Sequence, residues 1–433
     1  MRTSNDRVKG AAGAAALVTV TALALGTPVG AHDPETPEGQ AAARAFMADH
    51  EAASRDKPVK GPVPCENGTA DKYPCKNVDL MSVLPLNKIG GGNGNDIWGW
   101  TDSTTKKEYA LMGRTNGTAF VDITDPANPV YLGNLPSHGG RSAIWRDVKV
   151  YSDHAYVVAD AISDHGMQVF DLTRLRDVTS PQTFTEDAHY DKFGNSHNIA
   201  INEETGYAYA IGSNTCDGGP HIVDIREPKQ PAEAGCVSED GYTHDTQCVV
   251  YNGPDADYAG RELCFNSNED TVTIVDVTDK ASPKQISRTG YDGAAYTHQG
   301  WLTEDQRYFL LDDELDESRG TDKHTATYIW DLADLDAPQH KATYRSPATA
   351  IDHNQYVKGS HSYQANYQAG LRILDVSKAG EGQLSEVGFF DIYPKGDAAD
   401  FNGAWSVYPY SPSGTVIISG IEQGLVVVKP QLG

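Results

Sequence analysis

The segment Thr273-Ile274-Val275-Asp276, an apolar run that ends in Asp and leads into a turn, has five counterparts along the chain. They are Ala119-Phe120-Val121-Asp122, Met167-Gln168-Val169-Phe170-Asp171, His221-Ile222-Val223-Asp224, Tyr328-Ile329-Trp330-Asp331 and Arg372-Ile373-Leu374-Asp375. The six aspartates follow one another at intervals of 49, 53, 52, 55 and 44 residues. Such a period indicates one supersecondary motif per repeat, which buries its apolar faces against its neighbours. A seventh, divergent copy spans 424–429, with Lys429 where Asp is expected.

Each repeat divides into four short β-type runs separated by Gly, Asn, Asp and Pro. In the third repeat these runs cover 198–201, 206–212, 221–225 and 232–237. Four-stranded sheets that recur seven times at about 50 residues predict an all-β fold, a seven-bladed β-propeller. The last repeat offers only three strands, so we expect the strand at 78–86 to complete it and close the ring.

The aspartates that end the third strands are interpreted as structural. A turn ending in Pro follows several of them, as at 122–129, 224–231 and 276–283. An Asp side chain can accept backbone N–H groups and hold such a turn. We therefore expect no catalytic role for these residues.

The N-terminus has the features of a secretory signal peptide. Arg2, Arg7 and Lys9 precede an apolar stretch at 11–25, and Val29-Gly30-Ala31 resembles a cleavage site. The predicted organisation is a signal peptide at 1–31, a flexible Cys-bearing segment at 32–77 and the propeller at 78–433. No later apolar run is long enough to span a bilayer, so a secreted, extracellular protein is predicted.

The charge of the chain argues against nucleic acid as a partner. Without residues 1–31 it carries 32 basic and 59 acidic side chains, a net charge of −27. Phosphates would be repelled by this surface, whereas cations would be attracted. We expect a monomer whose partner is an extracellular protein, a glycan or a small ligand, with solubility as the simpler explanation of the charge.

All six cysteines follow the signal segment, as expected for disulfides in an oxidising compartment. Proximity in sequence suggests the pairs Cys65–Cys75, Cys216–Cys236 and Cys248–Cys264, although six cysteines permit 15 connectivities. A zinc site is less favoured because the sequence contains no Cys-x-x-Cys.

The apolar strands that end in Val-Asp resemble LVIVD repeats. Together with the signal peptide and the Cys-bearing segment, they make residues 60–433 similar to the bacterial secreted choice-of-anchor B family. The resemblance implies a seven-bladed propeller at or outside the cell surface. Members of that family vary in a C-terminal anchoring tail, and no such tail follows here, which favours release. The resemblance implies no particular activity and no catalytic residues.

A second periodicity concerns the starts of the first strands, which line the channel of a propeller. The positions are Asp96, Asp147, His197, His244, His298, His353 and Asn402, at steps of 51, 50, 47, 54, 55 and 49 residues. Equivalent positions on all blades form a ring around the axis, so these seven are the predicted ligand-binding residues. The second strands return to the same face and end in Asp160, Asn214, Asn268, Asp312, Asp313 and Asn366, which predicts a second polar ring outside the first.

Two functions remain open from the sequence. Neutral imidazoles are common metal ligands, which makes His197, His244, His298 and His353 candidate ligands of a divalent metal ion, in a metal-binding protein or a metal-dependent enzyme. The alternative is that these histidines hydrogen-bond neighbouring blades and only set the register of the repeats. The preferred function is a binding or scaffold module, because no complete catalytic signature is present.

One further stretch is rich in acids. The run Asp312-Asp313-Glu314-Leu315-Asp316-Glu317 could bind Ca²⁺ on a loop, although charged runs are usually solvated.

Overall fold

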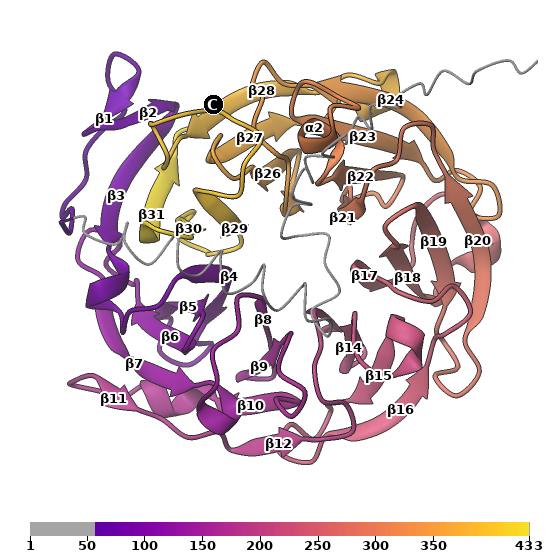
Figure 1. Cartoon of the computed structure of the whole chain (residues 1–433), viewed down its shortest axis with the longest axis horizontal. Helices are drawn as coiled ribbons and strands as arrows, with labels where there is room; N and C mark the ends of the chain where they lie inside the picture. The colour runs from indigo at the N-terminus through magenta and orange to yellow at the C-terminus, as the bar shows by residue number, and fades with distance from the viewer. Residues whose placement is uncertain (1–56, 433) are drawn as a thin grey trace, which may run out of the picture.

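The computed structural model describes residues 57–432 and has the predicted all-β architecture, a seven-bladed β-propeller (Figure 1). Seven antiparallel sheets are arranged around a central axis. The first strand of each blade faces this axis and contacts the first strands of the two neighbouring blades. The apolar core therefore lies between blades, and the innermost strands form a channel.

The strands of the first four blades run from the axis outward in the order of the sequence. Blade 1 contains β4 (Gly94–Thr101), β5 (Glu108–Arg114), β6 (Gly117–Asp122) and β7 (Val130–Pro136). Blade 2 contains β8 (Arg146–Tyr151), β9 (His154–Ala159), β10 (Met167–Asp171) and β12 (Ala188–Tyr190), while β11 (Gln182–Thr183) pairs with β7. Blade 3 contains β13 (Asn198–Asn202), β14 (Tyr207–Ile211), β15 (His221–Asp224) and β16 (Ala232–Cys236). Blade 4 contains β17 (Asp245–Val250), β18 (Glu262–Ser267), β19 (Thr271–Asp276) and β20 (Lys284–Gly290).

The remaining blades follow the same pattern, with additions from the N-terminus. Blade 5 contains β21 (Thr297–Leu302), β22 (Tyr308–Asp313), β23 (Ala326–Asp331) and β24 (Gln339–Arg345). Blade 6 contains β25 (Gln355–Lys358), β26 (His361–Ala365), β27 (Leu371–Asp375) and β28 (Ser385–Phe390). Blade 7 contains β29 (Ala404–Tyr408), β30 (Val416–Gly420), β31 (Gly424–Pro430) and β3 (Val78–Leu84). A four-residue helix, α2 (Asp316–Arg319), follows β22.

The ring is closed by the N-terminal strand, as predicted. β3 pairs antiparallel with β31, so Val78 lies opposite Pro430 and Leu84 opposite Leu425. Leu80 and Val83 are fully buried. This pairing covers the free edge of β31 and joins the two ends of the propeller, leaving no open edge between blades 7 and 1.

The repeated aspartates hold turns, as the sequence indicated. In each of the six copies, Oδ1 accepts the backbone N–H of the residue two positions later, at 2.8–3.1 Å. The residues are Asp122, Asp171, Asp224, Asp276, Asp331 and Asp375. Each strand ends where the carboxylate of its last residue accepts a hydrogen bond from the following backbone. This explains why the motif has Asp at that position.

Part of the segment assigned to 32–77 is built into the propeller. β2 (Tyr73–Lys76) pairs with β28 at the outer edge of blade 6, and β1 (Thr69–Ala70) pairs with β2. Tyr73 is buried and its ring packs 5.5 Å from that of Phe390. This apolar anchor and the Cys65–Cys75 disulfide explain why these residues are held in place despite their polar sequence. The predicted signal peptide at 1–31 lies outside the described residues. Within 57–432, no helix is long and apolar enough to cross a membrane.

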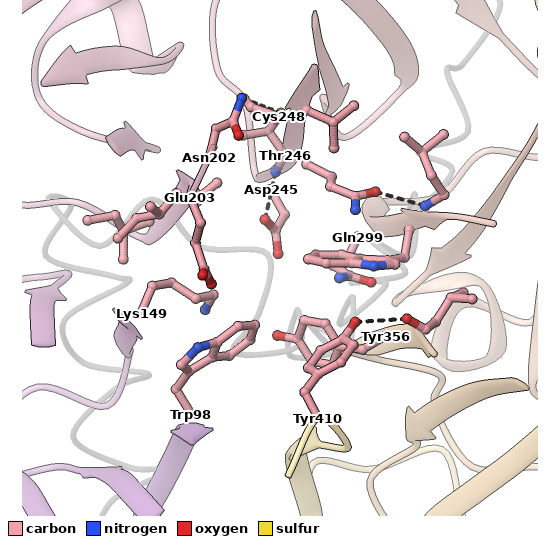
Figure 2. Close-up of a pocket in the computed structure, with 18 of the residues that line it drawn as sticks. Trp98, Lys149, Asn202, Glu203, Asp245, Thr246, Cys248, Gln299, Tyr356 and Tyr410 are labelled. Carbon is pink, nitrogen blue, oxygen red and sulfur yellow. Dashed lines mark hydrogen bonds between the residues drawn. The ribbon is translucent and has the colours of Figure 1, made fainter. Parts of the chain in front are cut away.

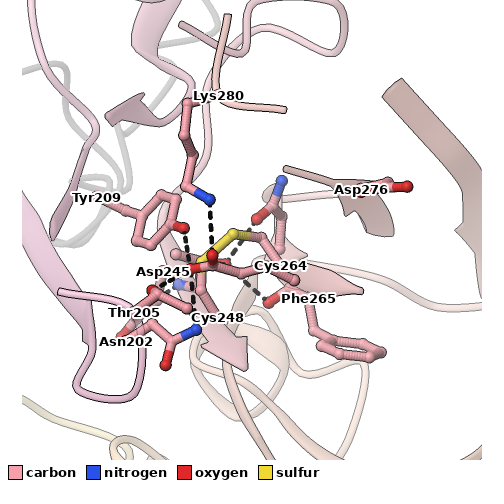
Figure 3. Close-up of a disulfide and its surroundings, with 12 residues drawn as sticks. Asn202, Thr205, Tyr209, Asp245, Cys248, Cys264, Phe265, Asp276 and Lys280 are labelled. Atoms are coloured by element: carbon pink, nitrogen blue, oxygen red, sulfur yellow. Dashed lines mark hydrogen bonds and ion pairs between the residues drawn. A yellow bond between two sulfur atoms is a disulfide. The ribbon is translucent and has the colours of Figure 1, made fainter. Parts of the chain in front are cut away.

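The three predicted disulfides are all formed: Cys65–Cys75, Cys216–Cys236 and Cys248–Cys264. Cys248 and Cys264 lie opposite each other on β17 and β18 (Figure 3). Beside them, Glu262 is 5 % exposed, and its carboxylate accepts hydrogen bonds from Asn202, Thr205 and Tyr209 and an ion pair from Lys280. This network ties blade 3 to blade 4.

Candidate metal centre in the axial channel

Four histidines meet at one end of the channel. His197, His244 and His353 stand just before the innermost strands of blades 3, 4 and 6, and His298 lies in β21 of blade 5. Consecutive ring centroids are 4.5 Å apart for His197–His244, 4.2 Å for His244–His298 and 4.5 Å for His298–His353. The 50-residue period therefore brings four imidazoles together, as the repeat alignment predicted.

The Nδ1 atom of each imidazole faces an oxygen that can only accept a hydrogen bond. Nδ1 of His197 lies 2.9 Å from Oδ2 of Asp160, and Nδ1 of His298 lies 2.8 Å from Oδ1 of Asp312. Nδ1 of His244 lies 3.0 Å from the carbonyl oxygen of His298, and Nδ1 of His353 lies 2.5 Å from that of Trp405. Each Nδ1 must donate its proton, which leaves the Nε2 lone pair available in the neutral ring. Asp160 and Asp312 belong to the predicted second polar ring.

The Nε2 atoms make no hydrogen bond to any residue in 57–432, and the group nearest to two of them is a carboxylate. Glu314 Oε2 lies 3.9 Å from Nε2 of His298, and Oε1 lies 3.6 Å from Nε2 of His353. Ligand atoms of these three residues all lie within 4.8 Å of one another. Tyr367 donates its hydroxyl to Oε1 of Glu314 at 2.8 Å, which orients the carboxylate. We refer to the four histidines and Glu314 as the axial cluster.

The axial cluster lines a small cavity of about 20 Å³. Aromatic side chains complete its wall, among them Trp145, Tyr367 and Trp405. The volume suits about one water-sized particle, so the space admits an ion and not an extended molecule.

Burial sets the protonation of the imidazoles. It lowers the pKa of His244 and of His298 well below the usual value, and it lowers the pKa of His353 to about 3. Burial also acts on His197, but the hydrogen bond and charge of Asp160 outweigh it and raise that pKa. At neutral pH at least three rings are therefore uncharged, which is the state that binds metal.

The structure separates the seven predicted ring positions into three groups. The histidines form the first. Asp96 and Asp147 form the second, because both contact the ammonium group of Lys149, at 3.3 Å and 2.5 Å. Asn402 is the third, since it is hydrogen-bonded to Gln368 and Glu422. Bulges in the inner strands, such as the one between Gly94 and Ile97 in β4, change which residues face the axis.

Glu314 and Tyr367 belong to the site but were not among the residues predicted from the sequence. Glu314 lies in the acid-rich run that was considered for Ca²⁺, one residue beyond the end of β22. Its position at the end of a second strand, as in the other blades, was the feature of the sequence that could have indicated its place in the site. Tyr367 carried no signal, because tyrosine is common in the strands of this chain.

No protein-family model matches the sequence, and no curated protein shows a significant match. Solved structures share its fold. Hydrazine synthase of Kuenenia stuttgartiensis is 14% identical over 75% of this chain and 93% of that chain, with a TM-score of 0.51. The Cps50 (Swd1) β-propeller domain of Myceliophteria thermophila is 13% identical over 74% of this chain and 93% of that chain, with a TM-score of 0.47. A protein from Lactobacillus plantarum is 15% identical over 75% of this chain and 88% of that chain, with a TM-score of 0.48. At these identities the likeness concerns the fold alone.

Proposed function

We propose that this protein binds one divalent transition-metal ion in its axial cluster. The observation that carries the proposal is that all four Nδ1 atoms are engaged by oxygen acceptors while the rings line one ion-sized cavity. Acceptors at Nδ1 hold the ring and increase the basicity of Nε2, as they do around histidine ligands of known metal sites.

The spacing of the rings suits a shared ion. An imidazole bound through Nε2 at ~2.1 Å has its centroid roughly 3.2 Å from the metal, so two such rings at right angles have centroids about 4.5 Å apart. The separation of 4.5 Å between the rings of His298 and His353 matches this value, and among the described residues these two histidines and Glu314 form the group whose ligand atoms lie within 4.8 Å of one another. Glu314 would add an oxygen ligand and a negative charge.

The donor set favours a first-row transition metal over Ca²⁺ or Mg²⁺. Imidazole nitrogens suit Zn, Cu, Fe and Ni, whereas Ca²⁺ and Mg²⁺ prefer oxygen ligands. Such an ion, when bound, can polarise a substrate oxygen or lower the pKa of water. A β-propeller fold is also compatible with a binding module. The ligand for which the axial cluster provides donor atoms is a metal ion.

Metal analysis tests this proposal. The full chain, purified without chelators, is expected to carry about one equivalent of metal, bound through Nε2 of His298 and His353 and an oxygen of Glu314, with His197 and His244 beside them. His298→Ala should lose this metal, whereas His340→Ala, which alters an exposed histidine outside the channel, should retain it. Less than about 0.2 equivalents in the wild type, unchanged on adding Zn²⁺, Cu²⁺, Ni²⁺ or Fe²⁺, would contradict the proposal.

We also propose that the chain is secreted and related to the LVIVD-repeat, choice-of-anchor B proteins. Three disulfides support an oxidising compartment, and the turn-holding role of the repeated aspartates supports a common repeat. Mass spectrometry of the protein from culture medium should find an N-terminus at His32. A full-length chain retained inside the cell would contradict secretion.

A further inference from the structure

A second, larger cavity lies along the same channel, beyond the axial cluster. It measures about 440 Å³, the size of a small-molecule site. His244 lines the small cavity, and the next residue, Asp245, lines the large one. The larger cavity therefore continues further along the inner strands, where five aromatic side chains and several carboxylates gather.

The aromatic wall is held together by ring contacts. Trp98 packs against Tyr356 and Tyr408 with centroids 5.4 Å and 5.0 Å apart, and Trp301 packs 4.9 Å from Tyr356. Tyr410 adds a fifth ring, 5.4 Å from Tyr408. Figure 2 shows Trp98, Tyr356 and Tyr410 on one side of the cavity and Asp245 on the other. Edge-to-face contacts of this kind fix the rings before any ligand arrives.

The side chains that line this cavity carry more negative than positive charge. Lys149 is its one basic lining residue among the described part of the chain. Its ammonium group is shared between Asp96 and Asp147 and lies 4.7 Å from the ring centroid of Trp98, so the other four rings remain for a ligand. Asp245 uses one oxygen to accept the N–H of Thr246 at 2.6 Å, and its other oxygen has no hydrogen-bond partner within 57–432. Glu203 also points into this space and has no such partner there (Figure 2). A cation is the natural complement of these carboxylates.

The amide groups of the lining offer little to a neutral polar ligand. Asn202 donates to Glu262, and Gln299 donates to the carbonyl oxygen of Gln355. Gln247 accepts the N–H of Leu302. These amides are engaged within the protein, so a ligand of this cavity would rely mainly on the aromatic faces and the carboxylates.

We propose that this cavity binds a small organic ammonium ion, held over the aromatic rings and paired with Asp245 and Glu203. The inference is independent of the metal centre, since none of these residues belongs to the axial cluster. Cation–π attraction and two carboxylates, one partly buried (Asp245) and one exposed (Glu203), together distinguish an ammonium from an uncharged group of the same shape.

Isothermal titration calorimetry of the full chain with choline and with 3,3-dimethyl-1-butanol, its uncharged carbon isostere, tests this inference. Choline should bind at least about 10-fold more tightly than the isostere. Asp245→Asn and Glu203→Gln should each weaken choline binding by about 10-fold, while Glu227→Gln, an exposed acid in the same blade, should not. Binding should also persist in His298→Ala.

Three results would overturn the inference. Equal binding of both probes would show an apolar pocket without charge selection. Tighter binding of a neutral sugar such as glucose would show a carbohydrate site. Absence of binding by choline, tetramethylammonium and primary alkylamines up to about 10 mM would show that the cavity is not an ammonium site.

A separate observation concerns three buried carboxylates beside the axial cluster. Asp316 and Glu317 lie in α2, and Asp352 precedes β25; they are 0 %, 8 % and 2 % exposed. Oxygens of the three lie within 4.8 Å of one another. Both oxygens of Glu317 and Oδ1 of Asp316 are buried without a hydrogen-bond partner, and none of the three residues has an ion pair among the described residues. Buried carboxylates this close together are stable only when they hold protons or bind a cation.

We infer that a Ca²⁺ ion neutralises this trio. The donor set is all oxygen, as Ca²⁺ prefers, and Glu317 has both oxygens free for a bidentate contact. The remaining oxygens already have partners, since Tyr328 donates to Asp316 at 2.7 Å and Asp352 accepts the N–H groups of Asp313 and Ala326 at 3.0 Å. These bonds fix the carboxylates around a common point.

Thermal unfolding of chelator-treated full chain with CaCl₂ tests this site. Millimolar Ca²⁺ should raise Tm of the wild type and of Glu381→Gln, an exposed acid elsewhere, but not of Glu317→Gln. His298→Ala should keep the Ca²⁺ response, which separates this site from the axial cluster. No shift in the wild type at about 10 mM Ca²⁺, with Glu317→Gln more stable than the wild type, would show that the carboxylates share protons instead.

Discussion

Oδ1 of Asp312 lies 2.8 Å from Nδ1 of His298 and also accepts the backbone N–H of Gln299 at 3.1 Å. One carboxylate oxygen thus fixes both the ring and the strand that carries it. The ionised form of Asp312 cannot donate, so in that form the proton of His298 is held on Nδ1 and Nε2 keeps its lone pair. Burial raises the pKa of Asp312, which opposes this form. The metal-binding competence of His298 therefore depends on Asp312.

Asp312→Asn should weaken metal binding without removing a ligand. The amide can turn its NH₂ toward Nδ1 and so favour the tautomer with the proton on Nε2. Affinity for Zn²⁺, measured by competition with a chromophoric chelator, should fall by about 10- to 100-fold. Asp292→Asn, an exposed acid in the connection between β20 and β21, is the matched control and should leave the affinity unchanged. Equal affinities in all three proteins would show that Asp312 does not position the ring.

The Glu262 network should be important for stability. Its carboxylate has four partners from two blades, so Glu262→Ala leaves Lys280, Tyr209 and their neighbours unpaired. We expect a loss of about 3 kcal/mol in the free energy of unfolding, measured by denaturation with urea. Glu227→Ala, on the exposed surface, should cost less than about 0.5 kcal/mol. Similar losses in both variants would contradict this role.

The ion pair between Arg176 and Asp102 should make stability depend on acid pH. The guanidinium donates to both carboxylate oxygens, at 2.7 Å and 2.9 Å, and lowers the pKa of Asp102 well below its usual value. A depressed folded-state pKa adds stability above the unfolded pKa of about 3.9, and this stability is lost as pH falls toward the folded value. Between pH 5 and 2.5 the Tm of the wild type should therefore fall more steeply than that of Asp102→Asn. Parallel curves for the two proteins would contradict the assignment.

Closure of the ring by β3 should be a major source of stability. Leu80 is fully buried in the closing strand β3, opposite Val428 of β31, so Leu80→Ala should cost about 3 kcal/mol in the free energy of unfolding. Val130→Ala, at a side chain that is 55% exposed, should cost far less. The comparison is made by chemical denaturation, and equal costs would show that the closing strand is dispensable.

The repeat made most of the fold predictable, because period, strand count and the missing strand of the last repeat are all visible in the sequence. The Asp turns and disulfides followed from local chemistry. The site was predictable only where the same residue type recurs, as with His197, His244, His298 and His353. Glu314 was marked only by its position at the end of a second strand, and Tyr367 by nothing. Asp96 pairs with Lys149 of the next blade, a long-range contact that spacing does not reveal, whereas Asp147 lies two residues from Lys149 on the same strand.

The same reasoning explains why the larger cavity was not foreseen. Trp98, Trp301 and Tyr356 come from three different blades and meet only because the inner strands converge on the axis. Their side chains look like ordinary strand residues in the sequence. Only the closed ring shows that they face a cavity with unpaired carboxylates.

The most direct test of the metal centre is an anomalous difference map from crystals of the full chain loaded with Zn²⁺, recorded at the zinc absorption edge. We predict one strong peak in the axial cavity, at ~2.0–2.2 Å from Nε2 of His298, with the other histidines and Glu314 around it. No peak among His197, His244, His298 and His353 at full zinc loading would contradict the account.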